Sequence, residues 1–252
     1  MLIDTHCHIH ESDYPLDIET TLKNAKDSDV SELLCVGTNI DSSIRAIAFA
    51  KDYSGTHATI GVHPHDTKDG WEELADIIKT NGIVAIGEIG LDYFYNHSDR
   101  KTQIKALKWQ IELAVKNNLP IVFHVRDAFD DFWPILDTFQ TAGHQIRGVL
   151  HSFTDNQQNL EEGLKRGLYI GVNGISTFTK DKAQQELFAS IPLASLLLET
   201  DAPFLTPAPF RGQTNEPAFV KNIAEYHAKV RGISFEEVCN VTTANARALF
   251  GL

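Results

Sequence analysis

Cysteine is scarce in this sequence of 252 residues, and its three cysteines, Cys7, Cys35 and Cys239, are odd in number and far apart. Such a set does not make a disulfide framework, which excludes the small secreted domains that disulfides hold together. The first residues show no basic segment followed by an apolar core, so they do not read as a secretory signal. These absences predict a reducing, cytoplasmic setting.

Basic residues are also few, with 22 Lys and Arg against 34 Asp and Glu and a formal net charge of −12. This balance excludes the simple basic nucleic-acid-binding module, although it does not exclude an enzyme that holds phosphates through metal ions. No run approaches the ~18 consecutive apolar residues of a membrane helix, so we expect no membrane association. A hydrophobic content of 42% with 22% charged residues is ordinary for a globular chain and excludes a disordered one.

Eight short apolar runs are present, and longer stretches with helical periodicity lie between them. The runs lack strict polar–apolar alternation, which is typical of strands buried on both faces of a parallel sheet. They cover residues 1–6, 32–37, 58–63, 83–88, 120–124, 147–151, 168–173 and 196–201.

Helix signals lie between the runs. Apolar residues recur at three- and four-residue spacing over 104–115, and Asn117 follows as a helix end. The same spacing over 219–230 leads to Gly232, a residue type that commonly ends helices. Ser234 and Glu237 resemble a capping box that opens the final helix.

Strand and helix alternating eight times predict an α/β protein with a (β/α)8 TIM-barrel fold. No linker, charge block or low-complexity segment interrupts the chain, so we expect a single domain over residues 1–252. A doubly wound sheet is the alternative. That fold usually has a glycine-rich turn after its first strand, where this chain has His6-Cys7-His8.

Imidazoles and carboxylates gather at or beside the ends of these runs. In a parallel barrel all strand C-termini open onto one face, so these side chains should converge there. Burying them without partners would be unfavourable, and a divalent metal, or a pair bridged by a carboxylate, would use each as a ligand. The predicted metal ligands are His6, His8, Glu88, His124, His151 and Asp201.

Two of these carboxylates are candidates for catalysis. Asp201 follows an apolar strand and is the best candidate for a general base, because it could bind a metal and still accept a proton from water. Glu88 has two oxygens and could bridge two ions, although a carboxylate that caps a strand–helix turn is the alternative. Asp92, in the same segment, could brace the loop or a ligand imidazole.

Three further residues are candidates for binding a substrate phosphate. His63 lies at a strand end beside an already full set of ligands, and a structural role is its alternative. Arg126 and Arg211 are the cations best placed to neutralise a bound phosphate. A solvated surface charge is the alternative for each arginine.

Blocks of residues in a characteristic order run through the whole sequence. The chain resembles the TatD family of metal-dependent deoxyribonucleases from residue 2 to its C-terminus. The blocks that carry the resemblance lie at 4–8, 61–65, 87–93, 120–128, 148–153, 198–204, 215–217 and 242–250.

The resemblance implies a TIM-barrel hydrolase of the amidohydrolase-like group with two divalent metal ions, which could be Mg, Mn or Zn. By position, His6, His8, Glu88 and Asp201 would hold the first ion, and Glu88, His124 and His151 the second. Glu88 would bridge the ions and Asp201 would be the base. The sequence departs from the family pattern at Asp155, where glycine is usual, and in the loop 211–217, which lacks the extra basic residues common in relatives.

The leading functional hypothesis is a 3′-exonuclease-like deoxyribonuclease that hydrolyses phosphodiester bonds in DNA, with RNA as a further substrate. We expect weak, salt-sensitive DNA binding because of the acidic balance, and we expect no obligate protein partner. A binuclear amidohydrolase or lactonase acting on a small molecule is the alternative enzyme. The absence of a Lys after the fourth strand, which many such sites use as a bridge, favours phosphoester chemistry. A metal-bearing scaffold without activity is a third interpretation.

Overall fold

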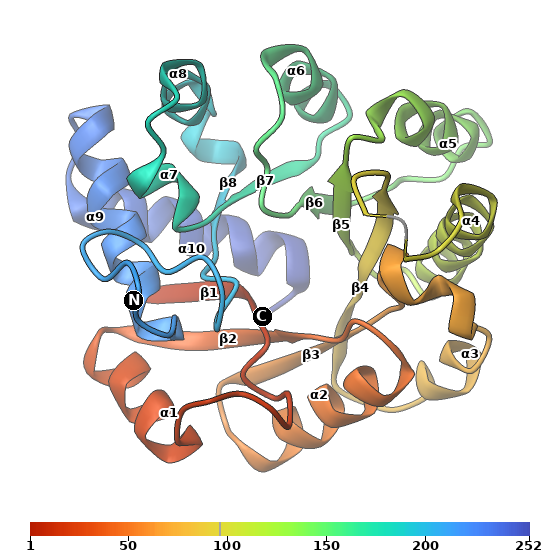
Figure 1. Cartoon of the computed structure of the whole chain (residues 1–252), viewed down its shortest axis with the longest axis horizontal. Coiled ribbons are helices and arrows are strands. Elements are labelled where there is room, and N and C mark those ends of the chain that lie inside the picture. The colour runs from red at the N-terminus through yellow and green to blue at the C-terminus, as the bar shows by residue number, and fades with distance from the viewer. Residues whose placement is uncertain (96) are drawn as a thin grey trace. The chain divides into compact units, whose positions relative to one another are not determined.

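Eight strands form one parallel sheet in which each strand lies next to its neighbours in the sequence (Figure 1). The computed structural model describes residues 1–95 and 97–252. Helices separate successive strands, and the predicted (β/α)8 TIM-barrel fold is confirmed. The strands are β1 (Leu2–Cys7), β2 (Val30–Val36), β3 (Thr56–Ile60), β4 (Ile83–Asp92), β5 (Ile121–Arg126), β6 (Gly148–Leu150), β7 (Tyr169–Val172) and β8 (Leu196–Leu198).

Helices of different lengths lie between and after these strands. The α-helices are α1 (Ile18–Asp27), α2 (Ile40–Asp52), α3 (Leu74–Ile77), α4 (Arg100–Lys116), α5 (Phe129–Thr141), α6 (Gln157–Lys165), α7 (Ile175–Phe178), α8 (Lys182–Ser190), α9 (Val220–Arg231) and α10 (Phe235–Phe250). Short 3-10 helices cover Pro64–Asp69, Leu193–Ser195 and Pro217–Phe219. None of the helices in the described part of the chain has both the length and the apolar character needed to cross a membrane.

By its internal contacts the chain divides into two compact units. The first combines Met1–Cys35 with Ser152–Leu252, and the second is Val36–His151. The expected single domain over residues 1–252 stays a prediction.

In the first unit, the ends of β1 and β8 are held side by side. Cys7 forms a parallel bridge with Ala202, and the backbone N–H of His8 donates to the carbonyl of Ala202 at 2.8 Å. The backbone N–H of Asp201 donates to the carbonyl of His6, also at 2.8 Å. Helix α10 packs against both strands. These contacts bring the residue after β8 next to the histidines of β1.

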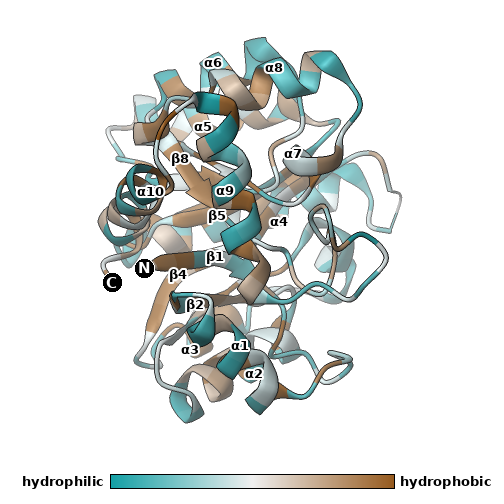
Figure 2. Cartoon of the chain, turned by 90° about the vertical axis from the view of Figure 1, so that its left-hand side faces the viewer, coloured by the Kyte–Doolittle hydropathy of each residue, from teal (hydrophilic) through white to brown (hydrophobic). Residues whose placement is uncertain are grey.

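In the second unit, β4 is the longest strand and pairs in parallel with both β3 and β5. Strands β4 and β5 are mainly apolar, as their brown colour in Figure 2 shows. Their pairing continues to Asp92, which lies opposite Arg126. Helix α4 packs along β4 and presents the buried Gln103 and Gln110. Because β4 and β5 extend far, polar side chains near their C-terminal ends are held on rigid backbone.

The observed strand ends differ from those expected. Glu88 and His124 lie within β4 and β5, whereas His63, His151 and Asp201 follow the ends of β3, β6 and β8. An apolar pattern marks the buried middle of a strand, but hydrogen bonds to neighbouring strands decide where it ends. The expected polar residues therefore lie near or just after the C-terminal ends of their strands, although they are not all the last residues of those strands.

Candidate metal centre

Two imidazoles of the first unit point toward each other at the end of β1. The Nε2 atoms of His6 and His8 are 3.1 Å apart, and both side chains are buried. Alternate residues of a strand project to the same side, which is why the His6-Cys7-His8 spacing brings these rings together. Cys7 is buried as well and directs its Sγ to the carbonyl of Leu34.

The Asp201 carboxylate completes this group. Its Oδ1 lies 3.7 Å from His6 Nε2 and 3.4 Å from His8 Nε2. Asp201 has a φ of 60°, in the left-handed region that Asp and Asn adopt more readily than most other residues with a side chain. This backbone conformation, three residues after β8, places the carboxylate beside the two imidazoles.

Neighbouring residues fix the segment that carries Asp201. The buried Asp4 accepts hydrogen bonds from the backbone N–H and the Oγ1 of Thr200, at 2.8 and 2.5 Å. Burial raises the pKa of Asp4 well above its ordinary value, although the hydrogen bonds from Thr200 oppose the shift. The buried Asn215 donates through Nδ2 to the carbonyl of Thr200 at 2.8 Å and to that of Phe204 at 2.5 Å. The loop after β8 is thereby attached on both sides of Asp201.

The separations within the group His6, His8 and Asp201 suit one small divalent cation. Ligands about 2.1 Å from a tetrahedral ion lie about 3.4 Å from one another. The three observed separations are 3.1, 3.4 and 3.7 Å. Mixed imidazole and carboxylate donors are accepted by zinc and several other divalent metals. His6, His8 and Asp201 therefore fit the divalent cation that the sequence predicted for them.

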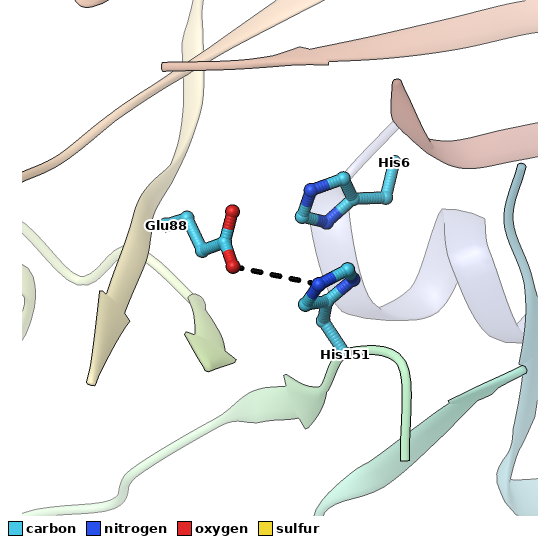
Figure 3. A group of neighbouring side chains, drawn as sticks. All are labelled: His6, Glu88 and His151. Atoms are coloured by element: carbon cyan, nitrogen blue, oxygen red, sulfur yellow. Dashed lines mark ion pairs between the residues drawn. The ribbon is translucent and has the colours of Figure 1, made fainter. Parts of the chain in front are cut away.

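The second unit carries its own donor group around Glu88, whose side chain is buried. Its Oε1 lies 2.9 Å from His124 Nδ1 and 3.6 Å from His63 Nε2. His151 Nε2 lies 3.4 Å from the same oxygen, the ion pair drawn as a dashed line in Figure 3. One carboxylate oxygen thus faces three imidazoles from different parts of the unit, a set of donors that could hold a divalent cation.

Asp92 orients the imidazole of His124. The Nε2 of His124 donates to Asp92 Oδ2 at 3.0 Å, so in the neutral ring Nδ1 keeps the lone pair that could bind a cation. Burial raises the pKa of Asp92, but hydrogen bonds from His124 and the backbone of Tyr95 outweigh it, and the net shift is downward. For His124, burial lowers the pKa, while hydrogen bonds to Asp92 and Glu88 outweigh that effect and raise it overall. The carboxylate of Asp92 therefore stays ionised and holds the ring in one orientation.

His63 lies within reach of Glu88 and His124 as a third donor, and its contact with a substrate phosphate stays a prediction. Burial, with the nearby His124, lowers its pKa well below the ordinary value. A neutral imidazole can bind a metal, so the geometry gives His63 a possible role that the sequence did not indicate. The motif 61–65 marked its position, but its closeness to Glu88 depends on how strands β3 and β4 pair.

The two predicted phosphate-binding arginines have different surroundings. Arg126 ends β5, is exposed, and stacks its guanidinium 3.9 Å from the centre of the Phe94 ring. Arg211 lies in the loop after β8, donates through Nη1 to the carbonyl of Thr206 at 2.8 Å, and stacks 3.9 Å from the Phe178 ring. Each guanidinium is thus held by a planar or polar neighbour, and the contact of each with a substrate phosphate stays a prediction.

Known proteins resemble this chain in sequence and in fold. A family model described as TatD related DNase matches residues 3–251. The uncharacterized metal-dependent hydrolase YabD of Bacillus subtilis is 38% identical, over 99% of this chain and 99% of that protein. The 3'-5' ssDNA/RNA exonuclease TatD of Citrobacter rodentium is 34% identical, over 100% of this chain and 98% of that protein. The crystal structure of YJJV, a TatD homolog from Escherichia coli, has a TM-score of 0.91 at 29% identity, covering 100% of this chain and 98% of that one.

Proposed function

Because this chain belongs to the TatD related DNase family of metal-dependent hydrolases, we propose that it hydrolyses phosphodiester bonds at the 3′ end of single-stranded DNA, with RNA as a further substrate. The observation that carries the proposal is the convergence of His6, His8 and Asp201 on one small volume. Two relatives that are each 34% identical to this chain are named 3'-5' ssDNA/RNA exonuclease TatD, which supports the choice of substrate.

We further propose that the donor groups of the two units hold two divalent cations, which could be Mg, Mn or Zn. His6, His8, Glu88 and Asp201 would hold one, and Glu88, His124 and His151 the other, with Glu88 shared. Within the second unit, His151 lies 3.4 Å from the Glu88 carboxylate, the ion pair drawn in Figure 3, which supports a shared role for Glu88 toward the second ion. Support comes from the fold, because the C-terminal ends of parallel barrel strands open onto one face.

The residues of the chain have distinct roles in the proposed reaction. Divalent cations held by these residues would lower the pKa of water toward ~7 and offset negative charge on phosphate oxygens. Asp201 would accept a proton from the water as the water oxygen forms its bond to phosphorus. The bond between phosphorus and the leaving sugar oxygen breaks, and that oxygen takes up a proton from solvent. Asp92 keeps His124 oriented, and Arg126 and Arg211 contact substrate phosphates as cations.

The proposed setting is the cytoplasm. Cys7, Cys35 and Cys239 are all free and buried, the state that a reducing compartment maintains. We propose that the protein acts there without an obligate partner. With a net charge of −12, it would bind nucleic acid weakly and in a salt-sensitive way.

The test is release of nucleotides from a 3′-labelled single-stranded oligonucleotide, measured with Mg, Mn or Zn added in turn. We expect metal-dependent release that falls at least ~100-fold in Asp201→Asn, because the variant loses a general base. Asn accepts the left-handed backbone of residue 201, so the fold should be kept. The matched control is Asp52→Asn at an exposed position of α2, which should retain activity.

Equal release by the wild-type protein and Asp201→Asn would overturn the proposed mechanism. The same preparations should be assayed on amides and lactones. Faster metal-dependent turnover of those compounds than of the oligonucleotide would favour the small-molecule hydrolase over the nuclease.

A further inference from the structure

Two aromatic side chains stand in solvent two and three residues after Asp92, the last residue of β4. Phe94 is 54% exposed and Tyr95 is 42% exposed. Their ring centres are 4.7 Å apart with the planes at 82°, an edge-to-face arrangement, and the Tyr95 ring also stacks with the His97 ring at 5.6 Å. Adjacent exposed aromatic residues beside a candidate catalytic site are typical of surfaces that bind a ligand or a partner molecule.

A cation lies against this aromatic pair. The guanidinium of Arg126 is 3.9 Å from the centre of the Phe94 ring and 5.0 Å from that of the Tyr95 ring. Arg126 is exposed, and Asp92 pairs with it across strands β4 and β5. Stacking on the rings limits the directions in which the guanidinium can point, while its edge can still donate hydrogen bonds.

One carboxylate connects the aromatic pair to the candidate metal donors. Asp92 Oδ1 accepts hydrogen bonds from the backbone N–H groups of Phe94 and Tyr95, both at 3.0 Å. Its Oδ2 accepts from His124 and His65, also at 3.0 Å each. The backbone of the aromatic pair and the imidazole of His124 are therefore held at a fixed separation by one buried residue.

We propose that Phe94, Tyr95 and Arg126 form a base-stacking platform for single-stranded nucleic acid. The platform binds the base of the nucleotide next to the phosphodiester that is cleaved, and Arg126 contacts a neighbouring phosphate. This inference rests on the proposed function and names the residues that would select its substrate. The proposed platform binds bases, whereas the residues that would hold metal ions lie at the phosphate that is cleaved.

The chemistry of the platform fits an unpaired nucleobase better than other occupants. Every base has a flat π-face that can stack on an aromatic ring, and single-strand-binding proteins combine such stacking with cations that follow the backbone. Bases within a duplex already stack on one another and do not offer that face. Two rings are also far less than the ~800 Å² that each partner contributes to a stable protein interface.

The experiment compares two single-stranded oligonucleotides that have the same phosphate backbone. One carries bases throughout, and in the other the two 3′-terminal nucleotides are abasic. For the wild-type protein we expect KM to be about 5- to 150-fold higher on the abasic substrate, the range expected for loss of base stacking. In Phe94→Ala/Tyr95→Ala this difference should disappear.

Two further variants separate stacking from damage to the fold. Phe94→Trp keeps an aromatic face and should preserve the difference between the substrates. Ile44→Ala removes another exposed apolar side chain of the same unit, 51% exposed on α2, and should behave as the wild-type protein. A double alanine variant that keeps the wild-type ratio of KM values would overturn the platform.

A binding measurement keeps the platform testable if no oligonucleotide is cleaved. In that case the proposed nuclease function fails, and fluorescence anisotropy of a labelled single-stranded oligonucleotide gives Kd directly. We expect Kd to rise at least about 5-fold in the double alanine variant. An unchanged Kd would overturn the platform independently of catalysis.

Discussion

Asp92 shows how one residue can serve two parts of a site. The sequence suggested either a brace for the loop or a brace for a ligand imidazole, and the structure shows both. Its partners His65 and His124 are 27 and 32 positions away. Separation in sequence does not specify which carboxylate oxygen accepts from which nitrogen. Residue types alone therefore could not decide between the two roles.

The same limit applies to the donors around Glu88. The sequence supplied six candidate ligands of suitable chemistry, and the structure brings them into compact groups within the two units. It did not indicate that His63 lies as close to Glu88 as 3.6 Å. That closeness depends on side-chain rotamers and on the pairing of strands, which a single sequence does not specify.

His227 on α9 should make stability depend on pH. It is fully buried, its Nε2 lies 3.1 Å from Ser176 Oγ, and burial together with Arg231 lowers its pKa to about 3. In the unfolded chain the pKa is about 6.5. Between these values the unfolded state binds a proton that the folded state does not. The contribution of His227 to the free energy of unfolding is therefore fully present above pH 6.5. It decreases as the pH falls, by about 3 kcal/mol at pH 4.

The measurement is the free energy of unfolding in urea between pH 4 and 6.5, for the wild-type protein and for His227→Leu. The free energy of unfolding should depend more steeply on pH in the wild-type protein than in His227→Leu, by about 1.4 kcal/mol per pH unit. The reason is that the variant lacks the titrating group. His144→Gln, at an exposed position, is the control and should keep the wild-type slope. Parallel curves for the wild-type protein and His227→Leu would contradict the prediction.

At the scale of elements, local signals placed helix ends more accurately than strand ends. Helix α4 ends at Lys116, directly before Asn117, and α9 ends before Gly232, whose φ of 65° is left-handed. Ser234 caps α10 as expected. A cap involves atoms within about four residues of each other, so the sequence contains the whole interaction.

Strand ends depend instead on distant partners. Strand β4 continues to Asp92 because its residues pair with β5 as far as Arg126, which the apolar run 83–88 could not reveal. The number and order of the strands were still predictable. Buried parallel strands need continuous apolar runs, and a βαβ connection permits few arrangements.

The cap of α10 allows a quantitative prediction. Ser234 Oγ accepts the backbone N–H of Glu237 at 3.0 Å, and α10 packs against β1 and β8. Ser234→Ala should lower the free energy of unfolding by about 1 kcal/mol, because that N–H loses its partner. Urea denaturation monitored by circular dichroism measures the change.

The matched control is Ser234→Asn, which keeps a side-chain oxygen able to accept the same N–H. It should unfold close to the wild-type midpoint. If the alanine and asparagine variants lose the same stability, the hydrogen bond at the cap does not explain the effect.

At the scale of the whole molecule, cation binding and folding should be coupled. Each unit has its own group of candidate donors, drawn from separate strands and loops, and an unfolded chain does not bring the members of either group together. A cation present at 100 times its Kd would stabilise the folded state by about 2.7 kcal/mol. For a chain of this length, that corresponds to a rise in Tm of about 5–10 °C.

Removing cations should therefore reveal the site even without a substrate. EDTA should lower Tm by about 5–10 °C and abolish hydrolysis, and adding back excess Zn or Mn should restore both. The shift in Tm should be smaller in Asp201→Asn, since that variant offers the cation a weaker ligand. A metal-loaded protein whose Tm is the same with and without the chelator would show that the clustered imidazoles and carboxylates do not couple cation binding to folding.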